Sequence, residues 1–332
     1  MTDPRFDIIA LGNAIVDVIS PVDDAFLQTW DITRDSMSLI DEARAKALTD
    51  AADGAEHSGG SAANTIAGIA SFGGKTAYFG KVADDRLGDV FRKDMAASDI
   101  PFPTSSLTDG PATARSIIFV TPDGSRSMNT FLGATVMFSP ADVDADMVAS
   151  AGILYLEGYL FDRDEAKSAF VHAAEIAAKA GRKVSLTLSD SFCVDRHRES
   201  FRHLIENHVD ILFANEAELL ALYETDDFET AIAQLRKDSP LAAVTRGPAG
   251  STIVSDGEPI HVPAEPVADV IDTTGAGDQY AAGFLFGLSR HLPLADCARL
   301  GHIAAAEVIS HYGPRPETSY RELANAAGLA IS

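Results

Sequence analysis

The sequence predicts an α/β protein: a three-layer αβα sandwich with a mainly parallel sheet and a small β-sheet lid. Beyond about residue 150, short apolar strands alternate with helical segments, and repeated βα units of this kind build a parallel sheet with helices on both faces. Two extended runs, 115–120 and 126–132, instead flank a Thr-Pro-Asp-Gly-Ser turn and predict a hairpin. Because a hairpin does not fit the alternation, we expect it to protrude from the main body as part of the lid.

The first half of the chain is expected to supply strands to the main sheet and pieces to the lid. An apolar run over 6–11 predicts a buried strand that bends at Gly12-Asn13 and then resumes. Further elements are expected as an extended segment over 36–40, helices over 41–53, 62–72 and 87–97, and a strand over 75–81. We treat 1–332 as a single domain whose lid is formed by parts of about 12–40 and 104–135.

In the second half of the chain, predicted strands and helices alternate regularly. Strands are expected over 153–156, 183–188, 211–214 and 242–245, a hairpin over 251–262, and helices over 163–180, 198–207, 216–223, 228–236, 278–289 and 294–311. This order predicts the large sheet.

The composition indicates a globular protein with a large core and excludes some partners. Of the 332 residues, 46% are hydrophobic, and 49 acidic against 26 basic residues give a net charge of −23. This charge argues against nucleic acid and against an anionic membrane surface as partners. A polyphosphate ligand would have to be captured locally, by backbone amides and a divalent cation. Cys193 and Cys297 have no companions at the spacing of a zinc site or a disulfide framework.

The first residues lack the basic and apolar regions of a signal peptide, and no apolar run is long enough to span a bilayer. We therefore expect a cytoplasmic enzyme.

The most informative motif is Asp-Thr-Thr-Gly-Ala-Gly-Asp at 272–278, followed at once by an apolar helical stretch. Its small residues let backbone N–H groups converge on an anion, and the helix N-terminus adds positive potential. If this loop only held phosphate, the negative charge of an aspartate beside it would repel the ligand. The aspartate makes sense if it acts as a general base. Our hypothesis is that Asp278 accepts a proton from a substrate hydroxyl while the amides of 275–277 stabilise a transferring phosphoryl group. The alternative is that Asp278 is an ordinary helix N-cap.

A second glycine-rich segment, Gly59-Gly60-Ser-Ala-Ala-Asn64, stands at the start of a predicted helix. It could hinge the lid or let a polar ligand lie against backbone, and the alternative is a tight loop. Asn13 and Asp17 lie four residues apart in the sequence, after the first predicted strand. Ribose hydroxyls would be suitable partners for Asp17, and the alternative is an aspartate at a strand end facing water.

Asn215 and Glu218 lie where a predicted strand runs into a helix. Ligands of open α/β sheets bind at the carboxyl ends of the strands, so these oxygens could orient water around Mg²⁺. The alternative is a helix cap made by an Asn with an acid three positions on.

Taken together and in this order, three motifs make the chain resemble the ribokinase-like (PfkB) carbohydrate kinase family. They are the Gly-Gly segment with Asn64, the Asn215-x-x-Glu218 pair and the motif at 272–278. The resemblance runs nearly end to end, and within the family the chain is most similar to the adenosine kinases. It implies the ribokinase-like form of the sandwich and a Mg·ATP-dependent kinase that phosphorylates the 5′-hydroxyl of adenosine or a related ribonucleoside. The alternative is a sugar kinase of the same family, acting on ribose, fructose or a related sugar.

The resemblance also implies roles for individual residues. Asp278 would be the base, and the amides of Gly275, Ala276 and Gly277 the anion hole. The nucleoside would be bound by Asn13, Asp17, Gly59, Gly60 and Asn64, with Tyr159 stacking on its base. Stacking tolerates different bases, so Tyr159 supports a nucleoside without naming which. The lid segment 36–39, Ser-Met-Ser-Leu, is more polar than in animal-type adenosine kinases, which suggests a different base preference.

The remaining implied roles concern ATP and cations. The ATP-binding residues would be Thr245, Arg246, Gly247, Gly250, His302 and Ala305. Asn215 and Glu218 would arrange the waters around Mg²⁺. Asp272, Thr274, Ser310 and Gly313 match positions that in many relatives hold K⁺ through mostly backbone oxygens. The partners would be a nucleoside or sugar and ATP, and the sequence leaves monomer and homodimer both open.

Overall fold

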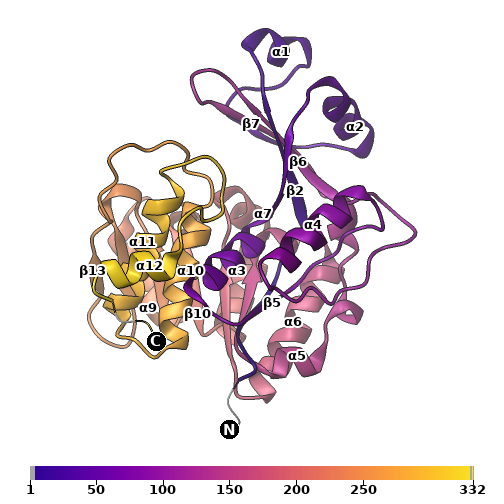
Figure 1. Cartoon of the computed structure of the whole chain (residues 1–332). Helices are drawn as coiled ribbons and strands as arrows, with labels where there is room; N and C mark the ends of the chain where they lie inside the picture. The colour runs from indigo at the N-terminus through magenta and orange to yellow at the C-terminus, as the bar shows by residue number, and fades with distance from the viewer. Residues whose placement is uncertain (1–3, 330, 332) are drawn as a thin grey trace.

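The computed structural model describes residues 4–329 and 331, and these form two sheets (Figure 1). The strands of the larger sheet are β1 (Phe6–Leu11), β5 (Thr76–Phe79), β8 (Ala151–Glu157), β9 (Lys183–Thr187), β10 (Ile211–Asn215), β11 (Ala242–Thr245), β12 (Ser251–Val254) and β13 (Ile260–Val262). They lie in the order β13-β12-β11-β10-β9-β8-β1-β5. The six strands from β5 to β11 are parallel, and β12 and β13 add an antiparallel edge.

Helices cover both faces of this sheet, which confirms the predicted three-layer sandwich. The first group of helices, on one face, is α3 (Ser61–Phe72), α4 (Arg86–Ala97), α10 (Ala276–Ser289), α11 (Leu294–Val308) and α12 (Tyr320–Ala326). The second group, on the other face, is α5 (Ala145–Ala149), α6 (Asp164–Lys179), α7 (Ser191–Asn207), α8 (Glu216–Tyr223) and α9 (Phe228–Asp238). Strand residues alternate between the two cores: Ile8 packs with the first group and Ile9 with the second. The alternation explains why these strands read as continuous apolar runs.

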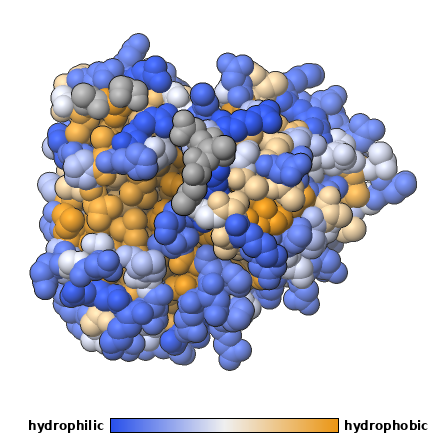
Figure 2. All heavy atoms as spheres, turned by 90° about the horizontal axis from the view of Figure 1, so that it is seen from below, coloured by the Kyte–Doolittle hydropathy of each residue, from blue (hydrophilic) through white to orange (hydrophobic). Residues whose placement is uncertain are grey.

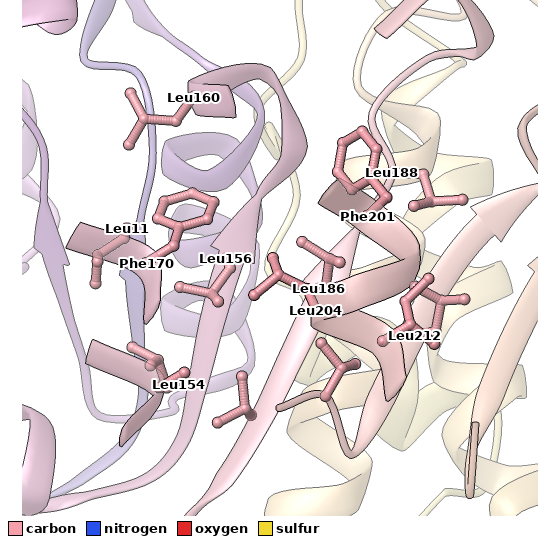
Figure 3. Packing of buried hydrophobic residues seen from close by; sticks show 14 of the residues in the cluster. Leu11, Leu154, Leu156, Leu160, Phe170, Leu186, Leu188, Phe201, Leu204 and Leu212 are labelled. Carbon is pink, nitrogen blue, oxygen red and sulfur yellow. The ribbon is translucent and has the colours of Figure 1, made fainter. Parts of the chain in front are cut away.

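The second of these cores is seen from close by in Figure 3. Leu154 and Leu156 of β8 project toward Phe170 of α6, while Phe201 and Leu204 of α7 cover the neighbouring strands. Helix α7 begins earlier than the expected residue 198, because Asp190 caps it by accepting a hydrogen bond from the N–H of Cys193. A kink at His197 divides the helix.

The smaller sheet forms the lid, which rises above the sandwich in Figure 1. Its strands are β2 (Ile15–Pro21), β3 (Met37–Leu39), β4 (Ala55–Gly59), β6 (Ala114–Val120) and β7 (Arg126–Phe131), in the order β3-β7-β6-β2-β4. Helices α1 (Asp24–Thr29) and α2 (Glu42–Ala51) pack on one face of it through Leu27, Leu48 and Phe119. The predicted hairpin is β6–β7. Short 3-10 helices are η1 (Gly133–Met137), η2 (Pro140–Asp142), η3 (Gly158–Asp162) and η4 (Gly247–Ala249).

The lid sheet is larger than the predicted segments 12–40 and 104–135. Strand β4, which pairs antiparallel with β2, and helix α2, which packs on β6, both lie outside those segments. The sequence of β4, Ala-Glu-His-Ser-Gly, has no apolar alternation, so nothing in its pattern predicts a strand. The chain thus enters the lid at Ile15 and returns to the sandwich at Gly59, immediately before α3.

No helix among the described residues is long and apolar enough to cross a membrane. The face opposite the lid has hydrophilic side chains around its rim and apolar side chains gathered over one half (Figure 2).

We predict that Gly283→Ala destabilises the fold. A Cβ at Gly283 would lie 2.4 Å from the main chain of Leu300, so α10 and α11 would have to separate. Overpacking of this kind costs about 1–3 kcal/mol of unfolding free energy, measurable by denaturant titration. Gly257→Ala is the matched control, because a Cβ there meets nothing within 4 Å. Equal stability of the two variants would contradict the close packing of these helices.

Candidate active site

A cavity of about 530 Å³ lies between the lid and the carboxyl ends of the main strands. Glu157, Thr187, Asn215 and Thr245, at the ends of β8, β9, β10 and β11, all line it. This is the edge at which open α/β sheets bind ligands. The predicted site residues in the lining are Asn13, Asp17, Gly60, Tyr159, Asn215, Glu218, Thr245, Thr274, Gly275, Ala276, Gly277 and Asp278. Ten predicted residues lie outside the lining: Gly59, Asn64, Arg246, Gly247, Gly250, Asp272, His302, Ala305, Ser310 and Gly313.

Asp278 lies in the first turn of α10 and faces the first turn of α3. Its Oδ1 accepts a hydrogen bond from Ser61 Oγ at 2.6 Å, and its Oδ2 accepts one from Asn64 Nδ2 at 3.0 Å. Burial raises the pKa of Asp278 to about 6, although both hydrogen bonds act to lower it. The carboxylate is therefore held in a fixed position and is mostly ionised at neutral pH.

The N-cap of α10 is Gly275, in a left-handed conformation with φ of 80°, so Asp278 is not the helix cap. A Cβ at Gly275 would also lie 2.7 Å from Pro314. At Gly277 a Cβ would meet nothing within 4 Å, so this residue borders open space. The turn at 275–277 thus brings backbone against the cavity at the positive end of α10, as an anion hole requires.

The two glycines before α3 let the chain pack against Asn13 and Asp17. A Cβ at Gly59 would lie 2.2 Å from Asp17 Oδ2, and one at Gly60, where φ is 95°, would lie 2.2 Å from the carbonyl oxygen of Asn13. Burial raises the pKa of Asp17 to about 7. Both Asn13 and Asp17 line the cavity beside Asp278.

Glu157 joins the first strand to α3. Its Oε1 accepts from the backbone N–H of Asn13 at 3.2 Å and from Asn13 Nδ2 at 2.9 Å, and its Oε2 accepts from the N–H of Ala62 at 2.7 Å. The side chain is 1% exposed, and burial raises its pKa to about 7. The sequence analysis missed Glu157, although an acid in the apolar run 153–161 was a usable signal.

Asn215 and Glu218 form a capping box at the start of α8. Glu218 accepts from the backbone N–H and the Nδ2 of Asn215, while Asn215 Oδ1 accepts from the N–H of Glu218. Burial, together with the charges of Asp190 and Asp278, raises the pKa of Glu218 to about 7. Asp190 and Asp278 line the same cavity, but no three acidic, His or Cys side chains of the described residues are grouped closely enough to hold a metal ion directly. The cap is present, and the role in holding Mg²⁺ stays a prediction.

Tyr159 lies in η3 with both ends of the residue held by Ser189. Its backbone N–H donates to Ser189 Oγ and its hydroxyl donates to the carbonyl oxygen of Ser189, each at 3.2 Å. On the lid, Met37 and Leu39 line the cavity, while the Ser36 hydroxyl is turned to the carbonyl of Thr33. The lid segment therefore presents its apolar side chains to the cavity, in spite of its polar sequence.

The residues expected to bind ATP lie at the end of β11, in the loop of η4 that follows it, and on α11. Gly247 and Gly250 have positive φ angles that shape the loop of η4, and Arg246 pairs with Glu216 at 3.0 Å. His302 on α11 lies 2.9 Å from Ser251 Oγ, and burial lowers its pKa to about 4, so its ring is neutral. Ala305 follows one turn later on the same helix and is half-buried.

Asp272 has its carboxylate satisfied within the chain. It accepts from the N–H and hydroxyl of Thr274 and from the N–H of Gly313, and it pairs with Arg126 of β7 at 2.7 Å. Arg126 also donates to the Thr274 hydroxyl, so a lid residue contacts the loop before α10. The hydroxyl of Ser310 donates to Glu307. With these side chains engaged, K⁺ at this group would be held by main-chain oxygens, as the resemblance implies.

The comparisons with known proteins identify the family of this chain. A family model described as pfkB family carbohydrate kinase matches residues 26–319. The chain belongs to the PfkB family of carbohydrate kinases. As a member of the family it is a phosphotransferase that acts on an alcohol group.

Three relatives each match nearly the whole length of this chain. A crystal structure of the adenosine kinase from Sinorhizobium meliloti is 50% identical, covers 97% of this chain and 99% of its own, and superimposes with a TM-score of 0.91. The crystal structure of a probable sugar kinase protein from Rhizobium etli CFN 42 is also 50% identical. It covers 98% of this chain and 100% of its own, and it superimposes with a TM-score of 0.93. The adenosine kinase of Saccharomyces cerevisiae is 26% identical over 95% of this chain and 97% of its own. These likenesses confirm the ribokinase-like fold.

We predict that Glu157→Gln destabilises the protein. A glutamine presents one oxygen where the carboxylate presents two, so at least one of the buried donors on Asn13 and Ala62 loses its acceptor. An unpaired buried donor costs about 1–3 kcal/mol of unfolding free energy. Glu229→Gln, at an exposed position of α9, is the control. Equal denaturation midpoints for the two variants would show that Glu157 does not join these segments.

Proposed function

We propose that this protein is a Mg·ATP-dependent nucleoside kinase that phosphorylates the 5′-hydroxyl of adenosine or a related ribonucleoside. The products are the nucleoside 5′-monophosphate and ADP. The observation that carries the proposal is the carboxylate of Asp278, fixed by Ser61 and Asn64 beside the small-residue turn 275–277. The adenosine kinase of Sinorhizobium meliloti, 50% identical over nearly the full length, supports the nucleoside as acceptor.

In the proposed reaction Asp278 is the general base. Its carboxylate accepts the proton of the 5′-hydroxyl as that oxygen bonds to the γ-phosphorus, and the bond from the γ-phosphorus to the β–γ bridging oxygen breaks to release ADP. The amides of Gly275, Ala276 and Gly277, at the N-terminus of α10, stabilise the charge on the transferring group. A positioned base contributes about 10²–10⁴-fold to the rate.

The acceptor side of the cavity suits a riboside. Asn13, Asp17 and Gly60 line it close to Asp278, and Asn64 lies behind them in contact with that base. Polar groups of this kind bind the 2′- and 3′-hydroxyls of ribose. Tyr159 on one side, with Met37 and Leu39 of the lid among the other lining residues, offers apolar surface for a nucleobase. A free sugar would use none of this surface.

ATP is proposed to lie on the other side of the turn 275–277, toward the loop of η4 and the face of α11. Thr245, Arg246, Gly247, Gly250, His302 and Ala305 would bind it there. Mg²⁺, held through water by Asn215 and Glu218, would neutralise phosphate charge. A role through water fits the absence of a direct group of three metal-binding side chains among the described residues, and the charges of Asp190 and Asp278 act on Glu218. A K⁺ ion would be held by main-chain oxygens of Asp272, Thr274, Ser310 and Gly313.

A PfkB sugar kinase is the second candidate, and the probable sugar kinase of Rhizobium etli supports it at 50% identity. The experiment that separates the two is release of ADP from Mg·ATP with adenosine, guanosine, inosine, cytidine, ribose or fructose, each with and without K⁺. We expect turnover with one or more ribonucleosides. Turnover with sugars but not with nucleosides would contradict the proposal.

We predict that Asp278→Asn abolishes turnover, because an amide cannot accept the proton, while nucleoside affinity stays within about the range of a single lost hydrogen bond. Affinity would be measured by calorimetry and turnover by ADP release. The control is Asp269→Asn, at an exposed position of the segment before the motif. Substantial kcat in Asp278→Asn would remove this residue from the role of base.

A further inference from the structure

Arg315 lies behind the acceptor side of the cavity and is not one of its lining residues. Its Nε is 3.5 Å from Asn64 Oδ1. Its Nη2 is buried and has no hydrogen-bond partner among the described residues. The charged groups that act on the guanidinium are the carboxylates of Asp94 and Asp17. The guanidinium thus lies beside Asn64 and within electrostatic range of Asp17, and Arg315 itself does not line the cavity.

The chain on both sides of Arg315 is fixed. The N–H of Gly313 donates to Asp272 at 2.9 Å, and the carbonyl of Pro314 accepts from Gln279 Nε2 at 2.7 Å. The N–H of Thr318 donates to Glu307 at 2.6 Å. Arg315 therefore extends from a segment that is anchored to the loop before α10, to α10 itself and to α11. Its guanidinium has a defined position relative to Asp278.

The guanidinium defines the orientation of the Asn64 amide. In the present orientation the amide oxygen faces Arg315 and the amide nitrogen donates to Asp278. After rotation of the amide by half a turn, its NH₂ group would face the cation and its oxygen would face the carboxylate. Both contacts would be repulsive. The contact between Arg315 and Asn64 is long for a hydrogen bond, so its contribution is mainly electrostatic.

The same cation acts on Asp17. Burial favours the neutral carboxyl at this position, and the charge of Asp278 acts in the same direction. Arg315 and Arg126 oppose them, with Arg315 the stronger of the two. An ionised Asp17 accepts hydrogen bonds from two hydroxyls, as the 2′- and 3′-positions of a ribose require.

We propose that Arg315 is a positioning residue of the acceptor site, which holds the Asn64 amide in the orientation that fixes Asp278. The inference rests on the proposed function, since it assigns Asp278 the role of base and Asn64 a role in binding the nucleoside.

The test compares Arg315→Met and Arg315→Lys with the parent enzyme, using the acceptor that the parent phosphorylates best. Arg315→Met should lower kcat by about 10- to 100-fold, as expected for a displaced catalytic group. It should also raise KM for the acceptor and leave KM for ATP unchanged. Arg315→Lys keeps the charge, so KM for the acceptor should return toward the parent value. A KM for ATP that rises in parallel, or a lysine variant no better than the methionine variant, would overturn the inference.

A double-mutant cycle tests the coupling to Asn64. If Arg315 acts on Asp278 through Asn64, Arg315→Met should change kcat little once Asn64 is replaced by Ala. Independent, multiplicative effects on kcat would overturn the inference. Arg321→Met is the matched control, because Arg321 belongs to the same C-terminal segment but donates to the carbonyl of Phe72, away from the cavity. Its kcat should equal that of the parent, and a loss like that of Arg315→Met would point to a general structural effect and overturn the inference.

Failure of this inference can be distinguished from failure of the proposed function. A parent enzyme that phosphorylates no nucleoside contradicts the proposed function. A parent that is active on nucleosides, with Arg315 and Asn64 acting independently, contradicts only the role of Arg315.

Discussion

The site depends on how closely the first turns of α3 and α10 approach each other. Gly68 allows this approach, since a Cβ there would lie 2.0 Å from Gln279 Oε1 and 2.7 Å from the Cβ of Ala282. The contact brings Ser61 and Asn64 to the two oxygens of Asp278. Two helix N-termini therefore meet at one carboxylate, and their positive ends lie beside the place proposed for the transferring phosphoryl group.

Burial of carboxylates is the second constraint. Asp17, Glu157, Glu218 and Asp278 all have pKa values raised to about 6 or 7, with burial as the largest cause in each case. In a chain of net charge −23, such a site can accept a polyphosphate only where amides and cations offset its own charge. The amides of residues 275–277 and the proposed Mg²⁺ would supply that offset.

The sequence predicted what depends on periodicity and on local motifs. Continuous apolar strands and amphipathic helices identified the sandwich, and the small residues at 275–277 indicated backbone against a ligand. Strand β4 was missed because its side chains are polar and its stability comes from pairing with β2. Glu157 stands out as an acid in an apolar run, but its partner Ala62 lies 95 residues away; Arg315 was missed because its partner Asn64 lies 251 residues away. Contacts of that range leave no mark in local spacing.

The central claim is that Asp278 is the group that receives the proton of the acceptor hydroxyl. It is tested most directly by a crystal structure with adenosine, Mg²⁺ and a non-hydrolysable ATP analogue. We expect the 5′-hydroxyl oxygen within hydrogen-bond reach of an Asp278 oxygen, about 2.6–3.2 Å, with the γ-phosphate analogue against the amides of residues 275–277. A 5′-hydroxyl bound away from Asp278, with another side chain in reach of it, would contradict the account.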